Sequence, residues 1–123
     1  MSAITKTILC VDDSPATLGT WIEALDQFGY RTIATTDPQA ALPILGCVPV
    51  ELALIDYFMP VLNGGTLAAS IREHSAIPII LASNNTSDIP VSVREVVDAI
   101  LPKQAGLASL VRTVNSLLSG NKS

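Results

Sequence analysis

Residues 52–64 read Leu-Ala-Leu-Ile-Asp-Tyr-Phe-Met-Pro-Val-Leu-Asn-Gly. The first four are apolar and have the length of a short buried strand. Asp56 follows them directly, and a proline and a glycine follow Asp56 at short offsets. Proteins of the α/β class place functional groups at the carboxyl ends of parallel strands. The stretch therefore predicts one carboxylate at a strand end, facing a shaped loop.

Outward from this stretch, apolar runs alternate with segments in which apolar residues recur at helical spacing. The alternation predicts an α/β protein with a single doubly wound sheet of five parallel strands and helices on both faces. The expected strands span residues 7–11, 31–35, 52–55, 77–82 and 99–101. The expected helices span residues 14–28, 37–45, 63–74 and 107–118, with a doubtful fourth helix, between the last two of these, within 89–97.

Local signals mark the helix ends. Ser14 before Pro15, and Asp37 before Pro38, have the pattern of an N-cap followed by proline in the first turn. Gly29 is placed to end the first helix as a C-cap. These positions support the division into elements.

The composition describes one folded domain. The chain has 123 residues, of which 49% are hydrophobic, and a mean hydropathy of +0.47, which is ample for a buried core. We expect one domain over residues 1–123 with its core at about 6–119 and a frayed tail over 119–123. The length leaves no room for an output domain.

Charge and targeting signals limit the partners. A net charge of −4 and a sequence pI near 4.6 argue against direct binding of nucleic acid or of an anionic membrane surface. Residues 1–6 lack the apolar core of a signal peptide, and no apolar run approaches the roughly 20 residues that span a bilayer. The sequence predicts a soluble cytoplasmic protein.

The two cysteines carry no metal or disulfide pattern. Cys10 lies in an apolar run, Cys47 follows Gly46, and neither belongs to a CxxC or similar spacing. We expect two reduced thiols.

Three carboxylates are expected to meet at one edge of the sheet. Asp12 and Asp13 follow the first strand and Asp56 follows the third, its expected neighbour. Like charges this close raise one another's pKa unless a cation or a proton compensates. Mg²⁺ suits such oxygen ligands, so the pattern favours a metal site, although Asp12 or Asp13 alone would also serve as a cap for the helix near Pro15.

Two further strand ends carry a hydroxyl and an ammonium. Ser83 ends the fourth strand and Lys103 follows the fifth. Taken singly, neither is specific, because serines are common at the rim of a sheet and a lone lysine after a strand is usually solvated. Together with the acids they give a phosphoryl-transfer geometry, in which the ammonium and a metal neutralise phosphoryl oxygens and the hydroxyl donates to one of them.

With these residues in this order, the chain resembles the receiver domain of bacterial two-component response regulators over essentially its whole length. The resemblance rests on Asp12-Asp13, on residues 56–64, on Ser83 and on Lys103. It implies a flavodoxin-like strand order of 2-1-3-4-5. Both a single-domain regulator and a receiver taken from a larger protein fit the sequence.

The resemblance implies a role for each matching residue. Asp56 would be the phosphoacceptor for a phosphohistidine of a sensor histidine kinase or a histidine phosphotransfer protein. Mg²⁺ would be bound by Asp13, by Asp56 and by the backbone carbonyl of Phe58, with Asp12 helping through water. Ser83 would rotate to bond the phosphoryl group, and Lys103 would pair with Asp56 and then with the phosphate. The chain would catalyse only its own phosphorylation and dephosphorylation, and signal to a downstream protein.

The chain departs from the receiver pattern near its fifth strand. Receivers commonly have an aromatic residue three positions before the lysine, where this chain has Ile100, and a proline after it, where this chain has Gln104. An isoleucine packs but has no ring to swing. We expect a trans bond between Lys103 and Gln104, because a cis bond to a residue other than proline costs roughly 2.5–4 kcal/mol.

A second departure follows the fourth strand. Asn84 occupies a position that is usually small, and residues 84–88 are rich in turn formers. Pro90 then interrupts the segment, so the fourth helix is expected to be short or irregular. Since many receivers dimerise through their fourth helix, fifth strand and fifth helix, we do not assume such a conventional dimer here.

Two single residues are read as structural. Trp21, the only tryptophan, recurs with Leu18, Leu25 and Phe28 at helical spacing, which predicts packing against the sheet. His74, the only histidine, is expected to be solvated at the end of a helix.

Two other classes of function remain open. A degenerate receiver would act as a phosphorylation-independent interaction module, which Ile100, Gln104 and Asn84 favour and the acids oppose. A Mg²⁺ phosphohydrolase or a flavodoxin-like redox protein is weaker, since Asp12-Asp13 would repel a bound phosphate and Asp56 lacks the Asp-x-Asp pattern of aspartyl phosphatases.

Overall fold

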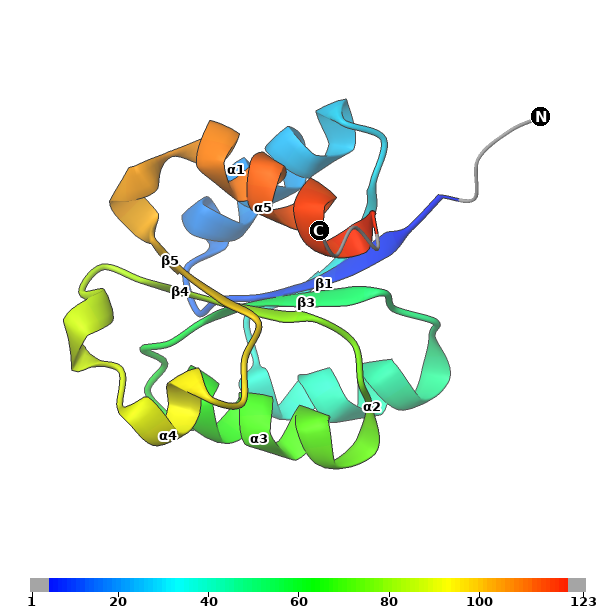
Figure 1. Ribbon diagram of the computed structural model, residues 1–123. Helices are drawn as coiled ribbons and strands as arrows, with labels where there is room; N and C mark the ends of the chain where they lie inside the picture. The colour runs from blue at the N-terminus through cyan, green and yellow to red at the C-terminus, as the bar shows by residue number, and fades with distance from the viewer. Residues whose placement is uncertain (1–4, 120–123) are drawn as a thin grey trace.

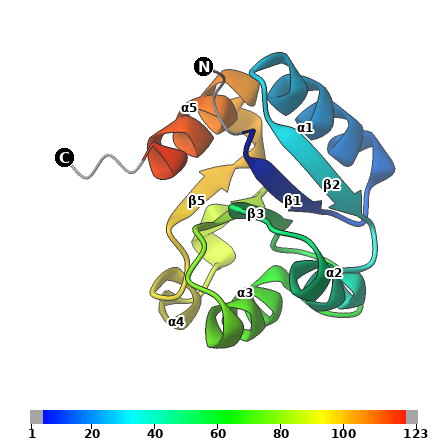
Figure 2. The ribbon, with the colours of Figure 1, turned by 90° about the vertical axis from the view of Figure 1, so that its right-hand side faces the viewer.

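The computed structural model describes residues 5–119 and arranges them in three layers around a central sheet (Figure 1). One face of the sheet carries α1 (Pro15–Gln27) and α5 (Leu107–Leu118). The other face carries α2 (Ala41–Cys47), α3 (Gly64–His74) and α4 (Val91–Arg94), as the end view also shows (Figure 2). Residues 1–4 and 120–123 lie outside the described residues. The prediction that the N-terminus lacks a signal peptide and the prediction of a frayed C-terminal tail fall mostly on these residues.

The sheet has five parallel strands in the order β2-β1-β3-β4-β5. This order and the placement of helices on both faces confirm the predicted α/β class and topology. The strands are β1 (Thr7–Val11), β2 (Arg31–Thr35), β3 (Leu52–Asp56), β4 (Ile79–Ser83) and β5 (Ala99–Pro102).

The register brings the carboxyl ends of the inner strands into one row. Val11 stands opposite Ile55, and Asp56 opposite Ala82. Ser83 pairs with Pro102, the residue before Lys103. The polar residues at these strand ends therefore emerge at the same edge of the sheet.

The core has two halves because both faces of the sheet are covered. Strands β1, β3 and β4 are buried at all five positions, as expected for strands between two helical layers. Alternate side chains enter opposite halves. Ile8, Leu54 and Ile80 lie in the cluster with α1 and α5, whereas Leu9 and Leu81 lie in the cluster with α3.

Helix α1 has the predicted caps. The Ser14 hydroxyl accepts a hydrogen bond from the Thr17 backbone N–H at 3.3 Å. Gly29 has φ of +87° and donates its N–H to the Asp26 carbonyl at 3.0 Å, while Tyr30 N–H donates to the Leu25 carbonyl at 3.1 Å. This pair of bonds is a Schellman motif, and its positive φ explains the glycine.

The predicted apolar face of α1 is correct for three of its four residues. Leu18, Trp21 and Leu25 are buried against the sheet. Phe28 is 60% exposed, because the helix ends at Gln27 and Phe28 is already the capping residue. Helical spacing could not place a residue beyond the last helical turn.

Strand β4 begins at Ile79, two residues later than the expected start at Ile77. Pro78 has no N–H to give to a neighbouring strand. The Ile77 carbonyl is occupied by the Arg72 guanidinium, which donates to it at 2.7 Å. The same guanidinium binds Asp98 at 2.8 Å, so Arg72 ties the entrances of β4 and β5 together.

Two helical segments are shorter than the alternation suggested. Residues 37–45, expected as one helix, form a 3₁₀ turn over Pro38–Ala40 capped by Asp37, and then α2. Helix α4 is a single turn, which confirms the expectation of a short fourth helix. It lies close to α3, since a Cβ on Gly65 would come within 2.8 Å of the Val93 side chain.

No helix within residues 5–119 is long and apolar enough to cross a membrane.

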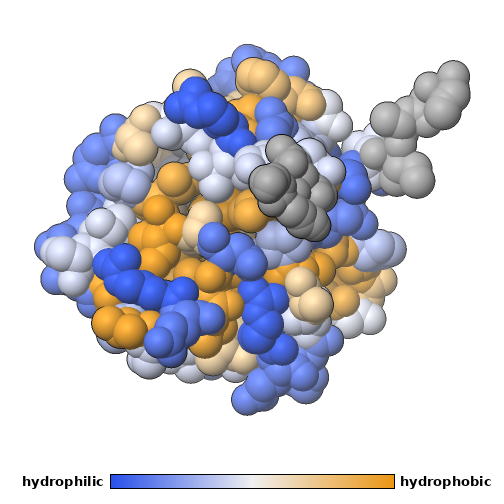
Figure 3. Space-filling model, in the orientation of Figure 1, coloured by the Kyte–Doolittle hydropathy of each residue, from blue (hydrophilic) through white to orange (hydrophobic). Residues whose placement is uncertain are grey.

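Strand β5 forms an edge that is only partly covered. Its residues are half-buried or exposed, unlike those of the inner strands. Apolar side chains gather on the face where β5 runs between α4 and α5 (Figure 3). The expectation that this face does not form a conventional dimer stays a prediction.

Gly64 shapes the loop that follows Asp56. Its N–H donates to the Tyr57 carbonyl at 2.7 Å, which closes the loop from β3 into α3. A Cβ at this position would lie 2.4 Å from the Asp56 carbonyl oxygen and 2.8 Å from Tyr57 Cα. Both are backbone atoms, so no side chain can turn away to make room.

We predict that Gly64→Ala destabilises the protein by about 1–3 kcal/mol or more, because a methyl group must displace backbone in a closed loop. Urea unfolding followed by circular dichroism measures the loss. The control is Gly19→Ala on the exposed side of α1, where an added Cβ meets nothing within 4 Å and helix propensity should add about 0.5–1 kcal/mol. Equal stability of the two variants would contradict the close-approach argument.

Candidate functional site

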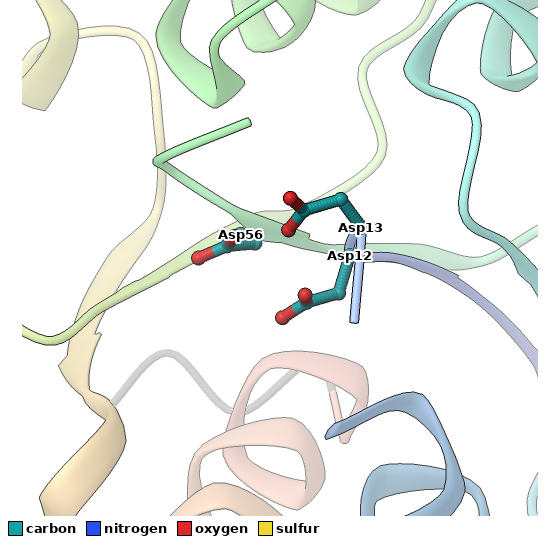
Figure 4. Close-up of side chains that lie close together, drawn as sticks. All are labelled: Asp12, Asp13 and Asp56. Atoms are coloured by element: carbon teal, nitrogen blue, oxygen red, sulfur yellow. The ribbon is translucent and has the colours of Figure 1, made fainter. Parts of the chain in front are cut away.

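Three carboxylates converge at the carboxyl ends of β1 and β3. Asp12, Asp13 and Asp56 offer oxygens that all lie within 4.8 Å of one another. Figure 4 shows Asp12 and Asp13 reaching toward Asp56 from the end of the neighbouring strand. Asp12 and Asp56 are buried, whereas Asp13 is exposed. The convergence predicted from the sequence is confirmed.

Lys103 bridges two of these acids. Its Nζ lies 2.9 Å from Asp12 Oδ2 and 3.0 Å from Asp56 Oδ1. Burial opposes the charged form of Lys103, but the hydrogen bonds to Asp12 and Asp56 outweigh it and raise the pKa of the ammonium. Lys103 therefore stays protonated at neutral pH. The pairing with Asp56 was expected, and the pairing with Asp12 was not.

The pKa of Asp56 is set by opposing influences. Burial raises its pKa, and the charges of Asp12 and Asp13 add to this effect. The hydrogen bond and charge of Lys103 lower the pKa but do not cancel the increase. An additional cation at the three acids would favour the ionised form.

Asp12 also fixes the start of α1. Its Oδ1 accepts a hydrogen bond from the Ser14 backbone N–H at 2.8 Å. Ser14, and not Asp12 or Asp13, is the residue that caps the helix. Asp12 thus has one oxygen on the helix entrance and the other on Lys103, which holds it rigidly beside Asp56.

Ser83 is fully buried at the end of β4. Its Oγ accepts a hydrogen bond from the Asn85 backbone N–H at 3.1 Å. The Asn85 side chain in turn accepts from Ser87 N–H and caps the 3₁₀ turn Thr86–Asp88. Ser83 therefore belongs to the folded loop between β4 and α4.

The departures from the receiver pattern have structural partners. Gln104 Nε2 donates to the Asn84 backbone carbonyl at 2.9 Å, so the residue in place of proline joins the loops after β4 and β5. Asn84 is exposed, and Ile100 packs against the cluster that contains Ile89. The Arg94 guanidinium donates to the Ile89 carbonyl at 3.0 Å and to the Thr86 carbonyl. The described residues contain no cis peptide bond, as expected at Lys103-Gln104.

The sequence did not indicate one neighbour of the site. The Trp21 ring, expected only as core, has Lys103 Nζ 5.9 Å from its centroid. Phe58, whose backbone carbonyl is one of the implied metal ligands, is 55% exposed in the loop after β3. His74 is exposed at the end of α3, and Cys10 and Cys47 are both free thiols.

The chemistry of these groups suits a hard divalent cation and a phosphoryl group. All three converging side chains are carboxylates, the donor type that Mg²⁺ binds. A protonated lysine and a hydroxyl flank them at neighbouring strand ends. Such an arrangement can neutralise the charge that develops on phosphoryl oxygens.

Comparisons with known proteins agree with this geometry. The family model for the response regulator receiver domain matches residues 8–115. Response regulator GtcR of Aneurinibacillus migulanus is 33% identical over 85 residues, which are 69% of this chain and 35% of that protein. The TorCAD operon transcriptional regulatory protein TorR of Escherichia coli O157:H7 is 31% identical over 113 residues, 90% of this chain and 49% of that protein. The chain spans about a third and about half of these two relatives.

Solved structures show the same fold. Response regulator protein TrrA from Thermotoga maritima, in complex with Mg²⁺-BeF, is 25% identical with a TM-score of 0.86, covering 92% of this chain and 99% of that one. A response regulator receiver domain (CheY-like) from Methylobacillus flagellatus is 22% identical with a TM-score of 0.85, covering 93% of this chain and 99% of that one.

We predict that Asp56 in the metal-free protein titrates above the ordinary aspartate range, because its raised pKa reflects burial next to two acids. The ionised fraction should fall as the pH falls through this raised pKa. Lys103→Met removes the influence that lowers the pKa, so its midpoint should move higher still. Carbon-13 NMR of the Asp56 carboxyl group measures both midpoints. Lys6→Met, an exposed lysine before β1, is the control. A lower midpoint in Lys103→Met would contradict the assignment.

Proposed function

Because this chain belongs to the receiver domain family of response regulators, we propose that it accepts a phosphoryl group on Asp56 from a phosphohistidine. The observation that supports this most directly is the placement of Asp56 Oδ1 3.0 Å from Lys103 Nζ, inside the cluster with Asp12 and Asp13. A sensor histidine kinase or a histidine phosphotransfer protein would be the donor.

The transfer is an in-line displacement at phosphorus. An Asp56 carboxylate oxygen attacks, an O–P bond forms, and the P–N bond to the donor imidazole breaks with its electron pair staying on nitrogen. The freed imidazole takes a proton from solvent. Lys103 stays protonated and neutralises charge on the phosphoryl oxygens, while the Ser83 hydroxyl, which only accepts from the Asn85 N–H, keeps its proton to donate to a phosphoryl oxygen.

The residues present fit Mg²⁺, and we propose that Asp13, Asp56 and the Phe58 carbonyl hold it, with Asp12 acting through water. When bound, it would supply positive charge against the acids and the incoming phosphoryl oxygens. The buried oxygens of Asp12 are already engaged by Ser14 N–H and Lys103, which supports an indirect role for Asp12. The exposed Asp13 is the most accessible of the three acids.

Signalling would follow from movement of the loop after β4. Ser83 is its first anchor, and Arg94 ties the rest of the loop to α4. Drawing Ser83 toward a phosphoryl group would therefore move α4, and a downstream protein would recognise the new position of this helix. We place this activity in the cytoplasm, without direct binding to nucleic acid or membrane and without enzymatic action on other substrates.

We expect wild-type protein incubated with Mg²⁺ and acetyl phosphate to gain one phosphoryl group, seen by intact mass spectrometry. Asp56→Asn should gain none, because the amide is not a nucleophile of this kind. Asp26→Asn, an exposed position on α1, is the matched control and should behave as wild type. A wild-type protein that gains no mass under saturating donor would favour the alternative, a phosphorylation-independent interaction module.

Removal of metal should silence the reaction. With EDTA the three acids and the donor's phosphoryl oxygens repel one another, so the phosphorylation rate should drop by at least about 100-fold. Asp13→Asn should require a higher Mg²⁺ concentration for half-maximal rate, because it replaces one charged ligand with a neutral oxygen. The measurement is the initial rate against Mg²⁺ concentration. An unchanged dependence in Asp13→Asn would remove Asp13 from the ligand set.

A further inference from the structure

Trp21 lies between the core and the site. It comes from the second turn of α1, the helix whose entrance is fixed by Asp12 through the Ser14 N–H. Its side chain is 6% exposed and belongs to the core cluster that includes Ala82 and Leu101. Core residues thus hold the ring in place. Its position is set by α1, the helix whose Ser14 N–H donates to Asp12.

The Lys103 ammonium lies over the Trp21 ring. Lys103 Nζ lies 5.9 Å from the ring centroid while it also contacts Asp12 and Asp56. This distance is within the range in which a cation is attracted to an aromatic face, and tryptophan attracts cations most strongly. The ammonium therefore has two carboxylate partners and one aromatic partner.

A cavity lies beside the Lys103 ammonium, on the side where the Trp21 ring is its partner. This cavity of about 410 Å³ separates α1 from the start of α5 and is lined by Thr17, Trp21, Leu101, Lys103 and Leu110, among others. Lys103 is the only charged residue among the described residues that line it. A lysine stem is flexible, so the ammonium has room to leave the carboxylates on this side.

The need for a third partner arises when the acids are occupied. A cation bound at Asp12, Asp13 and Asp56 weakens the attraction of these acids for the ammonium and repels it. The ring quadrupole is unaffected by this competition, because an indole has no charge to neutralise. It remains an attractive surface for Lys103 at the edge of the site.

We propose that Trp21 is a positioning residue, whose ring keeps the Lys103 ammonium beside Asp56 while a cation and a phosphoryl group share the acids. The inference rests on the function proposed above. It assigns a role in the transfer to a residue on α1 that acts through Lys103.

The first experiment compares Trp21→Phe with Trp21→Leu in the Mg²⁺ and acetyl phosphate reaction, followed by intact mass. Loss of the ring in Trp21→Leu should slow the initial rate about 3- to 10-fold, whereas the aromatic Trp21→Phe should lose no more than about 2-fold. In a Lys103→Met background, Trp21→Leu should cause no further loss. Urea unfolding of all variants reports their stability separately.

A purely structural role would give different results. Both substitutions leave space in the core, so both would then slow the reaction in proportion to their loss of stability, and would do so in Lys103→Met as well. Either of these outcomes would overturn the proposal.

A second experiment needs neither phosphodonor nor a substituted Trp21. Since Trp21 is the only tryptophan, its fluorescence reports this site alone. Lys103→Met should shift or change the intensity of the emission in metal-free protein, and Lys6→Met should not. Identical emission in wild type and Lys103→Met would overturn the proposed contact. If wild type takes up no phosphoryl group, the proposed function fails, and the contact is still decided by this fluorescence comparison.

Discussion

The rest of the site depends on the ion pairs that the Lys103 ammonium makes with Asp12 and Asp56. Parallel pairing of β1 with β3 forces acids at the ends of both strands into one place, and burial makes their repulsion costly. One lysine at the end of the edge strand offsets part of that repulsion. The three acids still leave a net negative site, which is the condition that favours a divalent cation and then a phosphoryl group.

Much of this was readable from the sequence because parallel strands expose their carboxyl ends at one edge. Asp56 follows an apolar run, and the same holds for Asp12 and Lys103, so strand assignment alone brought them together. Local chemistry also located the caps at Ser14 and Gly29. Side-chain partners across the fold were not readable in this way. The contacts of Lys103 with Trp21 and of Gln104 with Asn84 depend on how far α1 and the loop after β5 lie from the sheet, which spacing does not encode.

Element boundaries failed where a tertiary contact competed with local pattern. Pro78 cannot donate to a neighbouring strand, and Arg72 takes the Ile77 carbonyl, so β4 starts late. Phe28 follows the helical spacing of α1 but lies past its last turn, where Gly29 reverses the chain. Gln104, which departs from the receiver pattern, is likewise engaged: it binds the loop after β4 from one side, and Arg94 binds it from the other. Ile100 offers this loop no aromatic ring, whereas Gln104 and Arg94 give it polar contacts.

Helix α4 is a single turn that lies close to Gly65 of α3, and its stability depends on this packing. Four residues are far too few for a helix to persist by its own hydrogen bonds, so α4 is ordered only by its neighbours. Its backbone amides should therefore open to solvent exchange at a free-energy cost well below that of global unfolding. The segment beside the loop after β4 can therefore open locally, and a ligand that orders this loop would order α4 without disturbing the sheet.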